Sequence, residues 1–438
     1  MTALVTKDYL VDILEDAHSR TIELLDGLNQ DQMMGPRLPV VNPLLWEIGH
    51  VAWFTEQFIL RKLHGLDPIR PDLDDVYDSI AIEHSVRWDL PLLQLNESLT
   101  YIDQIKNKIF DRLEEGKADE ADSFIYQFAT FHQDMHNEAY SYSRQTLAYP
   151  APKFATTRNL TLTEADTGPY PGDADIPGGT FRLGSERDAP FLFDNEKWAH
   201  DVTVYPFKIA KAPVTNEEFA AFVADDGYHR RDLWPDVAWG DLKASGQQHP
   251  IYWISDGPAK WLTRRFDQVI DLPPYEPVVH VNWYEANAYC CWAGLRLPTE
   301  QEWEVAALGE LNPDGSLSLN KREYPWGGTA PTSNYANLDA LSLGCVEVSA
   351  LPDGDSAFGC RQMLGNVWEW TADTFKPYPG FEPDCYKEYS QDLFGISKVL
   401  RGGAWSTRSR MVNGTYRNYF APERNNVFSG FRACRPLA

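Results

Sequence analysis

The sequence predicts a chain in two parts, an all-helical N-terminal part followed by an irregular α+β part. Of the 15 tryptophans in the 438 residues, all but Trp46, Trp53 and Trp88 follow residue 150. Apolar residues recur at helical spacing before residue 150, whereas short β-branched and aromatic runs separated by Gly and Pro follow residue 175. The stretch between the two parts is rich in Pro, Gly, Thr and Asp and has no sustained periodicity. We therefore expect a helical domain, a linker and a second domain over residues 1–150, 151–175 and 176–438.

The helical part contains four stretches in which apolar residues recur three and four positions apart. They lie around residues 9–14, 44–52, 99–109 and 123–147. The segments that join them contain the prolines Pro39, Pro43, Pro68, Pro71 and Pro91. Four helices of this length fit an antiparallel four-helix bundle with one long crossing loop near residues 66–90.

The second part reads as short strands separated by turns, with two evident helices. The strand-like runs are HDVTVYPFKIAK, PVVHVNWY, SKVLRGGAW and FSGFRAC, and the helices are expected near residues 216–224 and 283–293. No repeat of 20 to 50 residues stands out, which disfavours solenoids and propellers. An irregular α+β domain is the expected architecture.

Composition excludes several classes of protein. Lys and Arg number 39 against 64 Asp and Glu, a net charge of −25 that repels nucleic acid and anionic membrane surfaces. No run of about 18 apolar residues appears, and acidic residues interrupt the first 20 positions, unlike a secretory leader. We expect a cytoplasmic protein with no nucleic-acid or membrane partner; the oligomeric state is left open. The six cysteines are too sparse and irregular for a disulfide scaffold, so free thiols are expected.

Two histidines on one predicted helix are the sharpest chemical signal. His132 and His136 are four residues apart, so they lie on one face of a helix, one turn above the other, as two ligands of one metal ion would. Such a pair is by itself often an ordinary structural feature. His50 strengthens the metal interpretation, because it lies in an apolar run of another predicted helix where an imidazole needs a partner.

Glu138 is the competitor for the third ligand position. It lies about 200° around the helix from His136, so it cannot point into the same site, and we assign it to a second shell or a helix contact. Three neutral imidazoles leave a divalent ion its full charge and three open positions. This ligand set permits iron(II) with dioxygen as well as a hydrolytic zinc site.

Motifs along nearly the whole chain resemble one known family. The patterns GHVAWF at 49–54 and HQDMHNE at 132–138 stand before IPGGTFRLGS at 176–185, LRLPTEQEWEVAA at 295–307, GNVWEW at 365–370 and RNYFAPERNNVFSGFRACR at 417–435. Together they resemble the ergothioneine-type sulfoxide synthases. That resemblance implies an N-terminal DinB-like four-helix bundle followed by a sulfatase-modifying-factor domain, the type found in formylglycine-generating enzymes, with a C-type-lectin-like fold. The formylglycine-generating activity itself needs two cysteines shortly before the final GFR, and this segment has none.

The resemblance also implies roles for individual residues. It makes His50, His132 and His136 ligands of iron(II), and it implies an oxygen-dependent coupling of a sulfur donor to C2 of the imidazole of hercynine. It makes Tyr386 in CYKEYSQDLFG a proton donor and Tyr389 its neighbour in the substrate pocket. The remaining positions are implied to bind substrates: Asn418 and Tyr419 the betaine end of hercynine, and Arg424 and Arg87 the carboxylate of the donor.

Two positions depart from the members of that family that use γ-glutamylcysteine. Phe420 replaces an Asp that would meet the amine of the donor, and Met135 replaces a Gln near the imidazole substrate. A different donor is therefore implied, either cysteine or a selenosugar, because the loop at 77–92 resembles that of the selenoneine-forming relatives. The prediction is an iron(II) oxidoreductase that uses dioxygen as co-substrate. Its rival is a binding or stress-response module that holds a metal without redox catalysis, and a structural calcium ion in the second domain is left open.

Overall fold

The computed structural model describes residues 4–116, 119–157, 167–187, 189–257 and 260–436. The chain divides into two compact units. The bundle unit comprises residues 1–155 and 187–191, and the mixed unit comprises residues 156–186 and 192–438. Each unit is described by itself. Within the described ranges, no helix is both long enough and apolar enough to cross a membrane.

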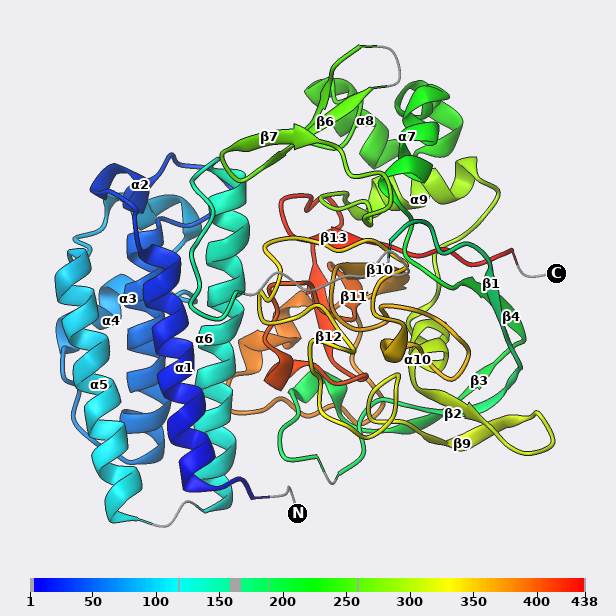
Figure 1. Cartoon of the computed structure of the whole chain (residues 1–438). Helices are drawn as coiled ribbons and strands as arrows, with labels where there is room; N and C mark the ends of the chain where they lie inside the picture. The colour runs from blue at the N-terminus through cyan, green and yellow to red at the C-terminus, as the bar shows by residue number, and fades with distance from the viewer. Residues whose placement is uncertain (1–3, 117–118, 158–166, 188, 258–259, 437–438) are drawn as a thin grey trace. The chain divides into compact units, whose positions relative to one another are not determined.

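The bundle unit is built on four long helices that lie side by side (Figure 1). They are α1 (Lys7–Leu25), α3 (Leu44–Thr55), α5 (Leu95–Glu115) and α6 (Glu120–Thr146). Helix α1 packs on α6, and α3 packs on both α5 and α6. The predicted four-helix bundle is confirmed. Shorter helices complete the unit: α2 (Gln30–Met34), α4 (Asp74–Tyr77) and 3₁₀ helices at Pro71–Leu73 and His84–Asp89. All of these except α2 lie within the predicted crossing loop.

Local sequence explains where these helices begin. The side chain of Thr6 accepts a hydrogen bond from the backbone N–H of Tyr9 at 3.1 Å and so caps α1. Asp119 and Asp122 form a reciprocal capping box at the start of α6. Helix α3 has no such cap and is instead buried along all twelve of its residues, and a π-helical segment, η1 (Glu56–Leu63), continues it. π-Helical turns are rare and occur frequently at functional sites. Helix α3, which leads into η1, is therefore a candidate to carry functional residues.

The mixed unit consists of small sheets and four helices. The helices are α7 (Asn216–Ala224), α8 (Asp236–Ser245), α9 (Trp283–Trp292) and α10 (Glu300–Leu308), of which α7 and α9 match the two predicted from the sequence. Antiparallel pairs join β1 (Asp173–Ile176) to β4 (Phe207–Ala210), β2 (Gly179–Leu183) to β3 (His200–Val204), and β8 (Gly309–Leu311) to β9 (Leu317–Lys321). A three-stranded sheet has the order β5 (Trp253–Ser255), β6 (Trp261–Arg265), β7 (Gln268–Asp271).

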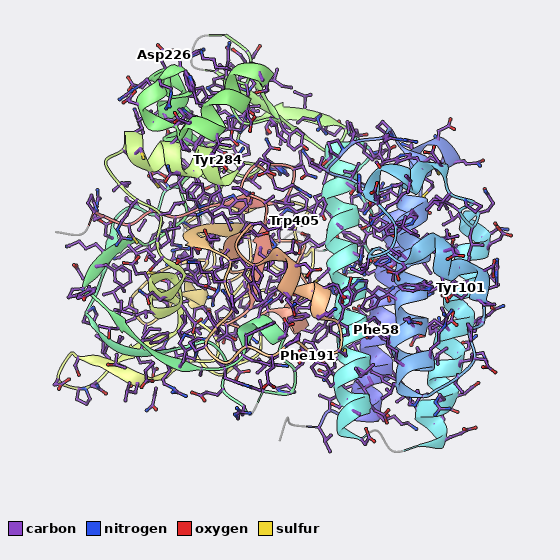
Figure 2. All side chains as sticks on the ribbon, turned by 180° about the vertical axis from the view of Figure 1, so that it is seen from behind. Phe58, Tyr101, Phe191, Asp226, Tyr284 and Trp405 are labelled. Carbon is purple, nitrogen blue, oxygen red and sulfur yellow. The ribbon has the colours of Figure 1, made fainter. Side chains whose placement is uncertain are left out.

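A four-stranded sheet forms the centre of the mixed unit. Its order is β12 (Arg417–Phe420), β11 (Lys398–Arg401), β10 (Trp368–Thr374), β13 (Ser429–Gly430), with only the β10–β13 pair parallel. Tryptophans of its strands and of α10 fill the core, and Figure 2 labels another, Trp405, inside this unit. The predicted irregular α+β architecture is confirmed. In the register of β11 and β12, Val399 faces Tyr419 and Leu400 faces Asn418, so two predicted substrate residues belong to a firmly paired strand.

Candidate metal centre

Helices α3 and α6 bring the three predicted histidines together. One nitrogen from each of His50, His132 and His136 lies within 4.8 Å of the corresponding atoms of the other two. The ring centroids are 5.2 Å apart for His50 and His132, 4.9 Å for His50 and His136, and 4.5 Å for His132 and His136. Because three ligands at this spacing can surround one ion, the cluster has the form of a metal site.

The ring of His50 is fixed by a carbonyl and by an indole. Its Nδ1 lies 2.8 Å from the backbone oxygen of Tyr77, and Trp46, one turn earlier on α3, stacks on the imidazole at 4.9 Å with an interplanar angle of 7°. A carbonyl can only accept, so Nδ1 carries the proton and Nε2 presents its lone pair. This outer contact sets the tautomer that a metal ligand requires.

Gly49 makes that contact to Tyr77 possible. A Cβ atom at this position would lie 2.2 Å from Cζ of the Tyr77 ring, far inside van der Waals contact. The Tyr77 side chain is wholly buried, and its hydroxyl accepts a hydrogen bond from the backbone N–H of Leu93 at 2.9 Å. The Gly-His pair at 49–50 is therefore a unit, in which the glycine admits the tyrosine whose carbonyl orients the histidine.

Glu47 orients His136 and was not among the site residues predicted from the sequence. Its Oε1 accepts a hydrogen bond from Nδ1 of His136 at 2.7 Å, and the carboxylate side chain is only 2% exposed. This pairing again leaves Nε2 of the histidine as the ligand atom. The signal was present, because Glu47 lies three residues before His50 on the same helix and interrupts an apolar run. Glu138 is half-buried on α6, and its assigned role stays a prediction.

His132 provides the test of whether the cluster fits a metal. Its ring stacks on Phe54 at 3.5 Å with an interplanar angle of 8°, and its buried Nδ1 has no hydrogen-bond partner among the described residues. Burial, reinforced by His136 and His50, holds the pKa of His132 well below its usual value. Burial and His136 also lower the pKa of His50. Buried nitrogens that stay neutral and remain unsatisfied are costly unless they bind something. The donor set therefore fits a divalent transition metal.

The ligand set by itself does not choose the metal. Neutral imidazole suits iron, zinc, copper and nickel alike. Three protein ligands leave open positions for exogenous molecules, which is the arrangement of a catalytic rather than a closed structural site. The cluster can therefore hold a metal that also binds small molecules.

Two further predicted residues of the bundle unit lie near this centre in the structure. Arg87 donates to Oδ1 of Asn42 at 2.8 Å and to the carbonyls of Ser79 and Ile82 at 3.3 and 3.2 Å. Its guanidinium also lies 3.9 Å from the ring centroid of Trp46, the indole that stacks on His50. Arg87 thus ties the crossing loop to α3, in addition to any contact with a substrate. Met135 is half-buried on α6, between the two histidines.

The predicted residues of the mixed unit lie in two groups. One contains the three tyrosines, and the other is a cation–π pair. Tyr386 immediately precedes a short turn at Lys387–Tyr389, and the backbone N–H of Tyr389 donates to the carbonyl of Tyr386 at 3.1 Å. The Tyr419 hydroxyl donates to the Tyr389 carbonyl, and Phe375 stacks on Tyr419 at 4.1 Å. Burial raises the pKa of both Tyr389 and Tyr419 well above the usual value, so both phenols stay protonated.

The cation–π pair consists of Arg424 and Phe420. The guanidinium of Arg424 lies 5.4 Å from the ring centroid of Phe420, and its Nε donates to Oδ1 of Asn426 at 2.9 Å. Phe420 therefore meets the arginine through its π face, where a carboxylate would have formed an ion pair. The chemistry at this position is that of a cation beside an apolar surface.

Comparisons with known proteins agree with this division of the chain. The sulfatase-modifying factor enzyme 1-like domain matches residues 159–437, and the DinB superfamily matches residues 13–138. These matches confirm the predicted fold class. A protein named hercynine oxygenase from Mycolicibacterium thermoresistibile is 36% identical over 96% of this chain and 93% of its own length.

Two more relatives show how much of the chain the similarity covers. The hercynine oxygenase of Mycobacterium tuberculosis is 35% identical over 98% of this chain and 99% of its own length. The formylglycine-generating enzyme of Streptomyces coelicolor is 34% identical but covers only 60% of this chain, together with 88% of its own length. The similarity to the first group therefore extends over both units, whereas the similarity to the second covers little more than half of the chain.

Proposed function

Since the chain belongs to the ergothioneine-type sulfoxide synthase family, we propose that it is an iron(II)- and dioxygen-dependent enzyme acting on hercynine. It joins a sulfur or selenium donor to C2 of the hercynine imidazole by oxidation. The observation that carries this proposal is the convergence of His50, His132 and His136, with two of the rings oriented by Tyr77 and Glu47. The names of the near-full-length relatives support hercynine as the substrate.

The reaction balances with one dioxygen. A C–H bond of the imidazole and an S–H or Se–H bond of the donor are lost, one carbon–chalcogen bond forms, and the chalcogen gains one oxygen atom. These changes release four electrons, which reduce dioxygen to that oxygen atom and one water. No further reductant is needed.

The bundle unit would supply the metal ligands. His50, His132 and His136 would hold the iron through neutral imidazoles, while Tyr77 and Glu47 keep two of the rings in the ligating tautomer. When bound, iron(II) supplies the redox chemistry with dioxygen and a common coordination sphere for both substrates. The surrounding rings of Trp46 and Phe54 exclude water from the histidines and fix their orientation.

The mixed unit would supply the proton and the contacts to the organic substrates. In this proposal the Tyr386 hydroxyl donates a proton as dioxygen is reduced, since a phenol with an ordinary pKa near 10 remains protonated until a strong base develops. Tyr389, Asn418 and Tyr419 bind hercynine. The rigid packing of Tyr419 on Phe375 supports an aromatic platform for the trimethylammonium group, which can accept no hydrogen bond.

We propose a donor other than γ-glutamylcysteine, either cysteine or a selenosugar. Phe420 offers no carboxylate for the amine of that dipeptide, and its π face lies beside Arg424. Met135 removes a polar contact on α6, and the guanidinium of Arg87 is already engaged by three oxygens of its own unit. Each of these features removes an ionic or polar contact that γ-glutamylcysteine, with two carboxylates and an amine, would use, whereas cysteine or a selenosugar needs fewer such contacts.

Oxygen uptake with a panel of donors tests the proposal. Protein loaded with iron(II) under anaerobic conditions is mixed with hercynine and, in separate vessels, with cysteine, γ-glutamylcysteine or a selenosugar, and product masses are recorded. We expect uptake that requires hercynine together with cysteine or the selenosugar. A clear preference for γ-glutamylcysteine would contradict the donor assignment, and absence of uptake with every pair would favour a module that holds a metal without catalysis.

A further inference from the structure

A three-residue turn at Asp194–Glu196 in the mixed unit is almost inaccessible to solvent. The exposed fractions of Asp194, Asn195 and Glu196 are 1%, 0% and 1%. The proposed chemistry uses none of them. Because burial of two carboxyl groups and an amide costs free energy unless these groups are bound, their partners indicate what the turn is for.

On one side, the turn holds the end of the tyrosine segment. The Ser390 hydroxyl donates to Oδ1 of Asp194 at 2.5 Å, and Nδ2 of Asn195 donates to Oγ of Ser390 at 3.1 Å. Ser390 is itself fully buried and directly follows Tyr389. Two side chains of the turn therefore grip one hydroxyl, which fixes the backbone at the end of the segment that begins with Tyr386.

On the other side, the same turn holds the strand that carries the predicted hercynine residues. The carbonyl of Asn195 accepts a hydrogen bond from Nη1 of Arg417 at 2.7 Å, and Arg417 is the first residue of β12. Oε2 of Glu196 accepts from the Thr415 hydroxyl at 2.8 Å, two residues before that strand. The turn is thus bonded to two segments that are about thirty residues apart in the sequence.

An aromatic contact also joins the turn to the tyrosine segment. Phe193, the residue before the turn, stacks on Tyr389 at 4.8 Å with an interplanar angle of 23°. Tyr389 in turn receives the hydroxyl of Tyr419 on its carbonyl. The residues from Phe193 to Asn195 therefore contact the tyrosine segment through both a ring and a hydrogen-bonded hydroxyl.

We propose that Asp194 and Asn195 are positioning residues that act through Ser390. They set the place of the Tyr386–Tyr389 segment relative to β12, and thereby the position of the proton donor relative to the residues that bind hercynine. This inference rests on the proposed function, in which Tyr386 donates the proton. Reacting groups must be held to a fraction of an ångström, and misplacement by about 1 Å can cost about 100-fold in rate.

The incomplete bonding of the turn supports a functional rather than a purely structural role. Oδ2 of Asp194 and Oδ1 of Asn195 are buried and have no hydrogen-bond partner among the described residues. Burial raises the pKa of Asp194 to about 6, which means that its charge is unfavourable where it lies. A cluster selected only for stability would be apolar or fully satisfied, whereas positions that serve activity often carry such a cost.

Ser390→Ala and Asp194→Asn test the inference, with Ser429→Ala as the matched control. Ser429 is also fully buried in the mixed unit, and its hydroxyl makes one hydrogen bond, to the carbonyl of Val281 at 2.9 Å. In the full-length iron-loaded enzyme we expect Ser390→Ala to lower kcat at least about 10-fold, with the KM for hercynine nearly unchanged. Asp194→Asn retains a neutral acceptor, so its effect should be smaller. The control should leave kcat unchanged.

Hydrogen exchange gives a readout that does not depend on turnover. The amides of Tyr389 and Leu393 donate to the carbonyls of Tyr386 and Ser390, both at 3.1 Å. We expect Ser390→Ala to accelerate amide exchange within residues 386–393 and nowhere else, and Ser429→Ala to leave this segment protected. Unchanged exchange together with unchanged kcat would overturn the inference.

A double-mutant cycle separates this inference from the proposed function. If Ser390 acts through Tyr386, then Ser390→Ala should cost little further rate in a Tyr386→Phe background. Full additivity of the two losses would overturn the positioning role while leaving Tyr386 as the donor. A Tyr386→Phe variant with undiminished kcat would instead contradict the role of Tyr386 itself, whatever the exchange data show.

Discussion

Two buried polar clusters, one in each unit, are built on opposite principles. In the bundle unit, the rings of His50 and His136 direct Nδ1 to the carbonyl of Tyr77 and to Glu47, so one nitrogen of each ring is left as a ligand atom. In the mixed unit, Arg401 and Arg417 share the carboxylates of Glu300 and Glu304 at 2.6 to 3.0 Å, so charge is balanced inside the protein.

The difference shows which cluster requires an external ligand. Buried ions that pair with one another are complete, and removal of one partner leaves an uncompensated charge. Buried neutral imidazoles that face one another are incomplete until they bind a cation. We therefore expect substitutions in the arginine cluster to change stability and substitutions in the histidine cluster to change function.

The largest expected effect is the loss of metal and activity on His132→Ala. Removal of one of three ligands should abolish stoichiometric iron binding and reduce hercynine-dependent oxygen uptake below detection, with helical content retained. Metal analysis after anaerobic loading and circular dichroism measure both. His18→Ala is the control, because His18 is equally buried in the same bundle but lies 3.3 Å from Asp103 rather than in the cluster. Equal loss of iron in both variants would contradict the comparison.

Arg401→Leu should have the largest effect on stability. The side chain is fully buried between Glu300 and Glu304. Its loss removes one of the two basic partners of each carboxylate, since Arg417 stays on Glu300 and Lys321 on Glu304, and should cost about 3 kcal/mol of unfolding free energy. Denaturation followed by tryptophan fluorescence measures this value, and iron content should be retained. Arg230→Leu removes an exposed ion pair with Asp225 and should cost less than about 1 kcal/mol. Similar losses of unfolding free energy in Arg401→Leu and Arg230→Leu would contradict the difference expected between a buried and an exposed ion pair.

Gly49→Ala tests how His50 is oriented within the bundle unit. The added methyl group collides with the Tyr77 ring, so the carbonyl that orients His50 must move, and we expect metal affinity to fall about 10- to 100-fold. Gly240→Ala on α8 meets no atom within 4 Å and should instead stabilise its helix by up to about 1 kcal/mol. Competition with a chelator measures the affinity. Unchanged affinity in Gly49→Ala would show that the contact to Tyr77 does not orient the ligand.

A pH dependence of stability is expected at Asp194. Burial raises its pKa to about 6, and the charge of Asp384 adds to the shift, whereas Ser390, the backbone of Asp384 and Lys197 oppose it; Tyr389 and Tyr419 lie nearby. Between pH 4 and 6 the folded protein keeps a proton that the unfolded chain has released. The contribution of this group to stability therefore falls as pH rises through that window.

Asp194→Asn removes this titration. Relative to the wild type, the variant should gain about 2–3 kcal/mol of unfolding free energy between pH 4 and pH 7, with no further change above that range. Denaturation curves at a series of pH values measure the difference. A gain that is independent of pH would contradict the assigned pKa.

Much of the bundle could be predicted because helical periodicity fixes which side chains share a face. The four long helices and the pairing of His132 with His136 follow directly from a period of 3.6 residues. Periodicity does not report hydrogen bonds between helices, so Glu47 escaped notice although it contacts His136. It also could not show that Phe191 stacks on Phe124 of α6 at 5.1 Å, beside that helix in Figure 2.

The mixed unit was less predictable because its contacts join distant segments. Helices α7 and α9 have strong N-caps in Thr215 and Asn282 and were found. The turn at Asp194–Glu196 has no local signature, and its partners Ser390 and Arg417 lie about 200 residues further along the chain. Adjacency on a helix sets Cys290 and Cys291 in different directions but does not report burial, and the structure buries Cys290 and exposes Cys291; all six cysteines, which lie within the described ranges, are free thiols as expected.

The stoichiometry of oxygen use with labelled dioxygen tests whether the enzyme couples the reduction of dioxygen to the oxidation of hercynine and its donor. Iron-loaded protein, hercynine and the active donor are mixed under a limiting amount of ¹⁸O₂, and the oxygen consumed is compared with the labelled product by mass spectrometry. We expect one dioxygen consumed for each product formed, one labelled oxygen atom in that product, and neither consumption nor product in His132→Ala. Oxygen consumption that is independent of hercynine, or a coupled product without the label, would contradict this coupling.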